Sequence, residues 1–294
     1  MKNVFKKKII LGTANFNQKY GINKNLIKKN EIKKLLNFAI QKKINTIDTS
    51  PNYKQSEKII GELGRNKFKI ISKIPKLPKN IKKKNIEKWI KKKVITSIKN
   101  LQIKKLEYLL LQDVNSLLSR NGNLLYKSMK NIKDIGLTKK IGISIYDFNT
   151  LENILKKFDF DLIQTPFNIL DQRLIKNGWL NKIKRKKIKI HVRSIFLQGI
   201  LLLNNNDLPP RLKNLKKKWI IWEKWLKKNK HTPLQACLSF IFNQRKINGV
   251  VMGYNNKDQL DQILTQKQIK KNFLVPKFNI QNKELIDPRK WTNK

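Results

Sequence analysis

Short apolar segments recur along the chain and alternate with amphipathic stretches. Eight of these segments are rich in Ile, Leu or Val and nearly continuous in apolarity: KKIILGT, INTIDTS, FKIISKI, LEYLLLQD, KKIGIS, FDLIQTP, IKIHVRS and INGVVMG. Parallel strands have this character because helices bury both of their faces. The pattern therefore predicts eight parallel strands, within residues 7–13, 44–50, 68–74, 106–113, 139–144, 160–166, 188–194 and 247–253.

The stretches between these segments carry apolar residues three and four positions apart, as one face of a helix requires. They predict helices at 32–40, 86–101, 148–158, 173–185, 213–230, 233–243 and 257–266. Eight strands that each lead into a helix predict an α/β protein of the (β/α)8 TIM-barrel type. A doubly wound open sheet is the alternative, but no Gly-x-Gly-x-x-Gly follows any of the strands.

No change of composition and no Pro/Gly-rich linker divides the 294 residues. We therefore expect a single domain over 1–294, with a barrel core at about 8–265 and a C-terminal loop or tail at 266–294. No apolar run reaches the roughly 20 residues of a membrane span. The apolar N-terminal segment is shorter than the core of a signal peptide, and Cys237 is the only cysteine. These features predict a cytoplasmic protein without a membrane span, a disulfide or a metal site.

The net charge is large: 67 Lys plus Arg face 19 Asp plus Glu, which gives a formal +48. Such a charge attracts phosphates, nucleic acid and anionic membranes. The excess consists of lysine, accompanied by Asn and Ile, whose codons are all rich in A and T, and it extends from end to end. We therefore attribute it to base composition. We expect no specific nucleic-acid partner, only weak nonspecific binding of polyanions at low salt.

In a barrel, chemistry is located where strands end and the following loops begin. Polar or small residues occupy these points on all eight predicted strands: Gly12-Thr13-Ala14, Asp48-Thr49-Ser50, Ser72-Lys73, Gln112-Asp113, Ser144, Gln164-Thr165, Arg193-Ser194 and Gly253-Tyr254.

One segment among these has a specific pattern. IDTSPNYKQSEKIIGELGR resembles the signature of the aldo/keto reductase family: Asp-Thr, a Tyr five residues after the Asp, then Ser-Glu and Gly. Six further segments resemble the family in the correct order: GTANFNQKYG, IISKIPK, GISIYDFNTLENIL, DLIQTPFNILDQRL, RSIFLQGILL and VVMGYNNKDQL. The resemblance covers roughly residues 8–264 and is closest to bacterial members.

The resemblance implies a catalytic group of Asp48, Tyr53 and Lys73. A carbonyl that accepts hydride becomes an alkoxide and needs a proton as its charge develops. The pKa of a tyrosine phenol is ordinarily about 10, and a nearby ammonium favours its ionised form. We expect Lys73 to activate Tyr53 as the general acid and Asp48 to orient the lysine. Where the family usually has a carbonyl-orienting histidine, this chain has Gln112, whose amide donates a hydrogen bond but carries no proton.

For the cofactor, the resemblance implies that Ser144 and Gln164 hold the nicotinamide carboxamide. Ile145 stands where the family has an asparagine. Arg193 occupies the position of the family's stacking aromatic residue, and a guanidinium plane also stacks on flat rings. Phe196 is the alternative stacking residue.

The loop after the seventh strand resembles the segment that lies across the pyrophosphate, and the segment after the eighth strand the one that meets the adenosine. The implied cofactor is NADPH, with NADH as the alternative, and the implied binding residues are Gly12, Thr13, Ala14, Ser144, Gln164, Arg193, Ser194, Phe196, Gly199, Gly253, Asn255, Lys257 and Gln259.

Three functions follow from the sequence. The first is an NAD(P)H-dependent oxidoreductase that acts on an aldehyde, ketone or sugar carbonyl, with Tyr53 as proton donor. The second is a catalytically weak or inactive nicotinamide-binding scaffold or sensor, which Gln112 motivates. The third is a polyanion-binding protein, which only the net charge motivates. The tryptophans at 219, 222 and 225 are consistent with a nucleic-acid or membrane surface, a lid, or a helix packed onto the barrel, of which we favour the last.

Overall fold

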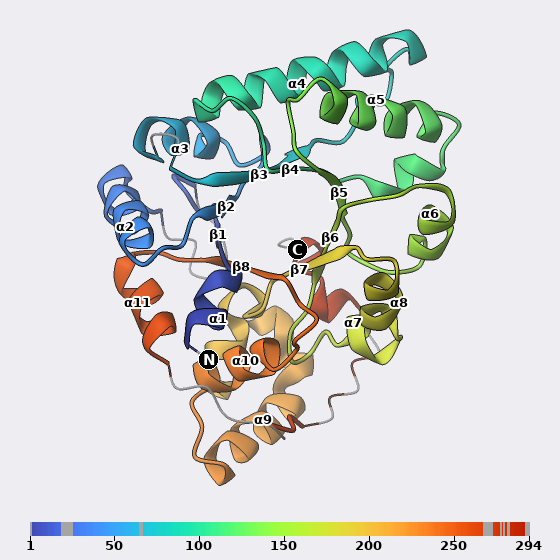
Figure 1. The fold of residues 1–294 in the computed structure, drawn as a ribbon. Coiled ribbons are helices and arrows are strands. Elements are labelled where there is room, and N and C mark those ends of the chain that lie inside the picture. Colours follow the sequence, from blue (N-terminus) through green and yellow to red (C-terminus); the bar gives the residue numbers. More distant parts are fainter. Residues whose placement is uncertain are drawn as a thin grey trace.

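Eight strands form a closed barrel in which each strand is parallel to the next and β8 returns to pair with β1 (Figure 1). The structure is a computed structural model, and it describes residues 2–18, 26–64, 67–266, 273–276, 278, 280 and 283–291. The strands lie within the eight predicted segments: β1 (Ile9–Gly12), β2 (Thr46–Asp48), β3 (Lys69–Ile74), β4 (Tyr108–Leu111), β5 (Ile141–Ser144), β6 (Leu162–Pro166), β7 (Lys189–Arg193) and β8 (Gly249–Gly253). The predicted single-domain (β/α)8 barrel is confirmed.

Helices surround the barrel on its outside (Figure 1). The α-helices are α1 (Lys2–Lys8), α2 (Lys29–Gln41), α3 (Ser56–Gly64), α4 (Ile86–Leu101), α5 (Gly122–Asp134), α6 (Leu151–Lys157), α7 (Arg173–Lys176), α8 (Trp179–Arg185), α9 (Lys216–Lys228), α10 (Pro233–Phe242) and α11 (Lys257–Thr265). Short 3-10 turns are η1 (Lys83–Asn85), η2 (Val114–Leu118), η3 (Leu197–Leu202), η4 (Asn205–Asp207), η5 (Pro210–Leu215), η6 (Lys283–Ile286) and η7 (Pro288–Lys290).

Two helix predictions are wrong in detail. The segment 173–185 forms two helices because Gly178 between them has a φ of +72°, a left-handed conformation that ends one helix before the next begins. The segment 213–230 begins as the 3-10 turn η5 and becomes α-helical only at Lys216. Consecutive prolines at 209 and 210 lack the N–H groups of a helix interior, so the chain enters this element through a tighter turn.

The inside of the barrel is filled by a buried cluster of Ile10, Ile71, Tyr108, Leu110, Leu162 and Val251, separate from the larger core between barrel and helices. Side chains alternate between the two faces of a strand, so a residue two positions further on points inward as well. After Ile71 that residue is Lys73, after Leu110 it is Gln112, and after Leu162 it is Gln164. The strand period therefore places a layer of polar side chains on top of the apolar layer.

The tryptophans of α9 are part of the packing, as we favoured. Trp219 and Trp222 are buried, and Trp222 stacks on Trp225 with ring centroids 5.3 Å apart. Trp219 also donates a hydrogen bond from its indole nitrogen to the carbonyl oxygen of Leu203 at 3.1 Å. The helix thus fixes the loop that follows β7.

Parts of the predicted tail pack against the barrel: Phe278 and Ile286 are buried. Residues 267–272, 277, 279, 281–282 and 292–294 of that tail lie outside the described residues. Within the described ranges, no helix has the length and apolarity to cross a membrane, and no group of His, Cys, Asp and Glu is arranged to hold a metal. Cys237 is buried and free.

A glycine in α3 sets how closely this helix approaches α4. A Cβ at Gly61 would collide with the backbone oxygen of Asn100 and lie 2.9 Å from the carbonyl carbon of Leu101. We expect Gly61→Ala to destabilise the protein by about 1–3 kcal/mol, because backbone cannot yield as a side chain does. Urea denaturation measures this, with Gly64→Ala as the matched control.

At Gly64 the nearest atom to an added Cβ is a side-chain carbon of Phe68 at 3.4 Å, an ordinary contact. We expect this second variant to change stability by under about 1 kcal/mol. Equal midpoints for the two variants would show that the α3–α4 contact tolerates a methyl group.

Candidate active site

A cavity of about 620 Å³ opens at the carboxyl ends of the strands. Every strand supplies the residue that continues its inward-facing row: Gly12, Asp48, Lys73, Gln112, Ser144, Gln164, Arg193 and Gly253. The loops add the remaining walls, including Tyr53 and Tyr146. All predicted site residues line this cavity except Lys257, so the structure brings together segments that lie far apart in the sequence.

The floor of the cavity contains a buried ion pair. The Lys73 ammonium lies 2.6 Å from Oδ1 of Asp48, and both side chains are at most 5% exposed. The ammonium also donates to the backbone oxygen of Thr49 at 2.9 Å. The other carboxylate oxygen accepts a hydrogen bond from the Gln164 amide at 2.7 Å. Buried charges require such partners, because each loses its hydration on folding.

The loop between β2 and α3 holds Tyr53 over this ion pair. The backbone N–H of Tyr53 donates to the backbone oxygen of Ser50 at 2.9 Å. The backbone oxygen of Tyr53 accepts from the backbone N–H of Ser56 at 2.8 Å. The Ser56 hydroxyl donates to the oxygen of Thr13 at 2.7 Å, which ties the loop to β1. As a result the ring centroid of Tyr53 lies 5.4 Å from the Lys73 ammonium.

The electrostatics of Tyr53 have two opposing causes. Burial raises the pKa of its phenol above the ordinary value, whereas the positive charges of Lys73 and Arg193 lower it. For Lys73, burial alone lowers the pKa, but the Asp48 carboxylate outweighs it and the net shift is upward. The lysine therefore stays charged, and the phenol stays protonated beside a cation.

Gln112 follows β4, the strand that pairs with the strand of Lys73, and its side chain is fixed by a neighbour. Its side-chain oxygen accepts a hydrogen bond from the amide of Asn52 at 3.1 Å. This bond directs the Gln112 amide N–H₂ away from Asn52 and leaves it as a donor. Neither histidine replaces it, because His191 lies below among the barrel interior and His231 lies outside beside Trp225. Burial, reinforced by Lys189, lowers the pKa of His191 to about 3, so it is neutral.

Ser144 and Gln164 lie side by side, as predicted, on adjacent strands. The Ser144 hydroxyl donates to the Gln164 side-chain oxygen at 3.2 Å. Since the same Gln164 amide donates to Asp48, it connects the serine to the ion pair. Ile145 is buried and offers only its backbone oxygen, which accepts from Arg193 at 2.9 Å.

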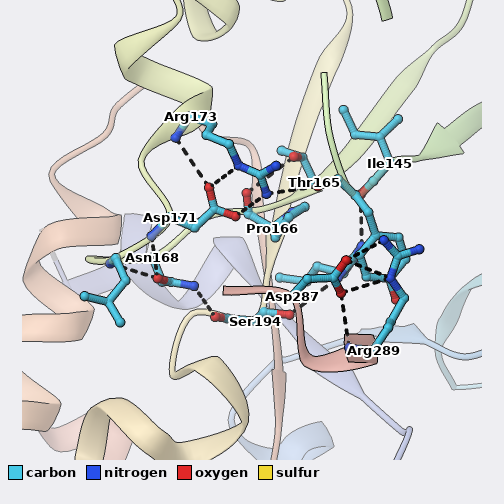
Figure 2. A network of polar contacts seen from close by, with 12 residues as sticks. Ile145, Thr165, Pro166, Asn168, Asp171, Arg173, Ser194, Asp287 and Arg289 are labelled. Carbon is cyan, nitrogen blue, oxygen red and sulfur yellow. Dashed lines mark hydrogen bonds and ion pairs between the residues drawn. The ribbon is translucent and has the colours of Figure 1, made fainter. Parts of the chain in front are cut away.

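The segment after β7 forms another wall. Arg193 ends the strand and Ser194 begins the segment, which Asn168 stabilises by donating to the backbone oxygen of Ser194 at 3.0 Å (Figure 2). Phe196 and Gly199 both line the cavity. Gly199 has a φ of +96°, a conformation that other residues rarely adopt, and an added Cβ there would meet nothing within 4 Å. The loop thus exposes bare backbone to the cavity.

The β8–α11 wall is polar but uncharged. Gly253, Asn255 and Gln259 line the cavity there. Lys257 does not: its side chain is half exposed and its ammonium lies 3.4 Å from Asp258.

A nicotinamide dinucleotide fits the residues present in three respects. Oδ1 of Asn15 is a buried acceptor in the cavity wall without a protein partner among the described residues, which suits a ribose hydroxyl. A Cβ at Gly253 would approach nothing closer than 3.8 Å, so its place in the cavity is open to a ligand. The Ser144–Gln164 pair adds the donor and acceptor that a carboxamide needs.

Sequence reasoning missed several contributors. Tyr146, Asn15 and Asn52 lie within segments that resemble the family but have no role predicted from the sequence. Ser72, at the end of its strand, points away from the cavity, and its hydroxyl donates to buried Glu57 at 2.8 Å. The signal available for Tyr146 was its place two residues beyond Ser144. The other lining residues missed were Ile195, Gln198, Leu202, Leu203, Thr232, Pro233, Leu234, Val251, Met252, Gln262, Ile263 and Gln266.

Comparison with known proteins gives a family and a fold. Residues 8–272 match the aldo/keto reductase family. The chain is similar to an aldo-keto reductase from Bacillus halodurans in its holo form, at 16% identity over 90% of this chain and 88% of that chain, with a TM-score of 0.70. It is also similar to a glycerol dehydrogenase from Gluconobacter oxydans, at 17% identity over 90% and 88%, with a TM-score of 0.66. No curated protein sequence matches it.

The buried ion pair has a testable energetic signature. We expect Lys73→Met to destabilise the protein by about 3–5 kcal/mol, because it leaves the Asp48 carboxylate buried without its cation. The double variant Asp48→Asn with Lys73→Met should recover much of this loss, since no uncompensated charge remains. Urea denaturation of the wild type, both single variants and the double variant measures the coupling.

The matched control is Lys139→Met, which breaks the partly exposed 2.8 Å ion pair with Glu107. It should cost no more than about 1 kcal/mol. Additive effects in the Asp48–Lys73 cycle would contradict the coupling.

Proposed function

Because the chain belongs to the aldo/keto reductase family, we propose that it is an NAD(P)H-dependent oxidoreductase that transfers hydride between nicotinamide and an aldehyde, ketone or sugar carbonyl. The observation that carries this proposal is the Asp48–Lys73 ion pair, buried under Tyr53 in a cavity at the carboxyl ends of the strands.

The proposed proton donor is Tyr53. As hydride adds to the carbonyl carbon, negative charge develops on the oxygen, and the phenol hydroxyl transfers its proton there. The Lys73 ammonium stabilises the phenolate that remains, and Asp48 keeps the ammonium in place. In the reverse direction the same phenolate accepts the alcohol proton. The arrangement therefore serves either direction of reaction.

Gln112 is proposed to orient the carbonyl. Asn52 occupies its side-chain oxygen, so its N–H₂ group remains as a donor to the carbonyl oxygen. The amide stabilises the negative charge on the carbonyl oxygen by a hydrogen bond alone, whereas a histidine can also be protonated and positively charged. We expect Gln112 to sustain turnover at a rate lower than a histidine would give.

The cofactor, when bound, supplies or accepts the hydride. Ser144 and Gln164 are proposed to hold the carboxamide, Arg193 or Phe196 to stack on the ring, and the backbone at Gly199 to approach the pyrophosphate. The wall after β8 is proposed to meet the adenosine. NADPH is the proposed partner from the family resemblance, and Lys257 remains a proposed contact to its 2′-phosphate.

A second candidate rests on Gln112: a nicotinamide-binding scaffold or sensor that turns over slowly or not at all. Efficient carbonyl reduction excludes it, whereas tight dinucleotide binding with little or no turnover on a broad aldehyde panel supports it. Weak binding of polyanions, abolished by about 150 mM salt, is proposed as a by-product of the net charge.

The first test replaces the proton donor. Tyr53→Phe should lower the rate of aldehyde reduction by about 10²–10⁴-fold, because it removes the general acid and keeps the ring. Fluorescence titration with NADPH and NADH should give the wild-type dissociation constants, since the change is a single hydroxyl. Equal rates for the two proteins would remove Tyr53 from the mechanism. Absence of dinucleotide binding by the wild type would remove the proposed function.

The second test changes the carbonyl-orienting residue. Gln112→Leu should lower kcat by about 10²-fold or more, because one hydrogen-bond donor to the developing oxyanion is lost. Gln112→His should raise kcat above wild type and add a pH dependence centred at about 6.5, the ordinary pKa of a histidine. Steady-state kinetics from pH 5 to 9 distinguishes these outcomes. An unchanged kcat in the leucine variant would show that Gln112 does not touch the carbonyl.

A further inference from the structure

The charged side chains that line the cavity include one more cation than anions. Of the described residues that line it, only Asp48, Lys73 and Arg193 carry charge, and the first two neutralise each other at 2.6 Å. One guanidinium therefore remains without a counterion. Arg193 forms no ion pair within 4.0 Å among the described residues, although it is half buried.

Two aspartates in the same polar network, Asp171 and Asp287, are already engaged by other arginines (Figure 2). Asp171 accepts from Arg173 at 2.7 Å on each of its two oxygens. Asp287 accepts from Arg289 in the same two-pronged way, at 2.9 and 2.6 Å. Bidentate pairs of this kind are strong, and the charge of Arg193 reaches Asp287 without forming an ion pair with it within 4.0 Å. The protein thus supplies a carboxylate for Arg173 and for Arg289 but not for Arg193.

The Arg193 side chain is held rather than loose. One terminal nitrogen donates to the backbone oxygen of Ile145 at 2.9 Å and the other to the hydroxyl of Ser194 at 3.4 Å. Its central carbon lies 4.0 Å from the ring centroid of Tyr146, which Arg289 also contacts at 3.3 Å. A guanidinium has five N–H donors. Three of those on Arg193 have no acceptor among the described residues.

The position of this cation relates it to the reacting end of the cavity. Arg193 is close enough to Tyr53 and Lys73 for its charge to lower the pKa of both groups. A molecule whose carbonyl contacts Tyr53 therefore has the free edge of Arg193 within its reach. A half-buried cation of this kind is satisfied best by an anion that accepts two of its N–H bonds.

We infer that the carbonyl substrate is an anion, and that its carboxylate or phosphate group binds the free N–H edge of Arg193 while its carbonyl contacts Tyr53. This inference rests on the proposed carbonyl reduction. Arg193 thereby selects substrates by their charge, in addition to its proposed contact with the cofactor.

The experiment compares pairs of probes in which a charged carboxylate is replaced by its neutral methyl ester. The substrates are 4-carboxybenzaldehyde and its methyl ester, and a binding pair, benzoate and methyl benzoate, is titrated calorimetrically onto the protein with and without saturating NADPH. The proteins are wild type, Arg193→Met and Arg193→Lys. The matched control is Arg185→Met, which removes an exposed arginine at the end of α8, outside the cavity lining.

The expected results are two ratios of charged to neutral probe, one of kcat/KM and one of affinity. In wild type and in Arg185→Met, kcat/KM should favour the carboxylate over the ester, and affinity should favour benzoate over methyl benzoate, by about tenfold or more. Both ratios should fall to near one in Arg193→Met, whatever its absolute activity, and part of the preference should return in Arg193→Lys.

Two results would overturn the inference. One is a wild-type ratio near one, or a preference that survives in Arg193→Met. The other is a loss of NADPH affinity in Arg193→Met with the charge preference intact, which would assign the arginine to the dinucleotide. If wild type reduces neither aldehyde and binds no dinucleotide, the proposed function fails, and the benzoate ratio without NADPH still decides whether Arg193 binds an anion.

Discussion

The pairing of Lys73 with Asp48 is the interaction on which the rest of the site depends. Two charges are buried at the top of an apolar barrel interior, where an unpaired charge would be very costly. Their remaining hydrogen-bonding capacity is met by the Thr49 backbone and by Gln164. Those contacts in turn fix the start of the loop that carries Tyr53 and the amide beside Ser144. Removal of one partner therefore disturbs both the proposed acid and the proposed carboxamide site.

The barrel imposes this arrangement through a simple alternation. Directly below the cavity, the inward-facing residues of three strands are Ile71, Leu110 and Leu162, which pack tightly and exclude water. One step higher, the same rows present Lys73, Gln112 and Gln164. The apolar layer supports the polar layer rigidly, which suits groups that must keep a fixed geometry during a reaction.

Arginine organises the rim of the cavity as the ion pair organises its floor. Arg173 donates to the backbone oxygen of Tyr146 at 3.0 Å, and Arg193 and Arg289 contact its ring. Segments after β5 and after β6, the last residue of β7 and a segment near the C-terminus thus meet at one tyrosine. Two of the three guanidiniums have their own aspartate, and the third faces the cavity. A ligand anion is the natural complement to that third charge.

The sequence by itself determined the barrel, because buried parallel strands impose a continuous apolar pattern that eight segments of this chain follow. Strand ends, where a barrel accepts polar residues, pointed to Asp48 and Lys73 as candidates, and the resemblance to the family signature added Tyr53. The sequence did not determine which neighbour at a strand end points inward: Ser72 faces Glu57, while Lys73 faces the cavity. Only the tertiary structure decided that, along with the role of Asn52 toward Gln112 and the lack of a counterion for Arg193. Such contacts join residues from different loops, and their pairing depends on strand register and loop path, which no local pattern encodes.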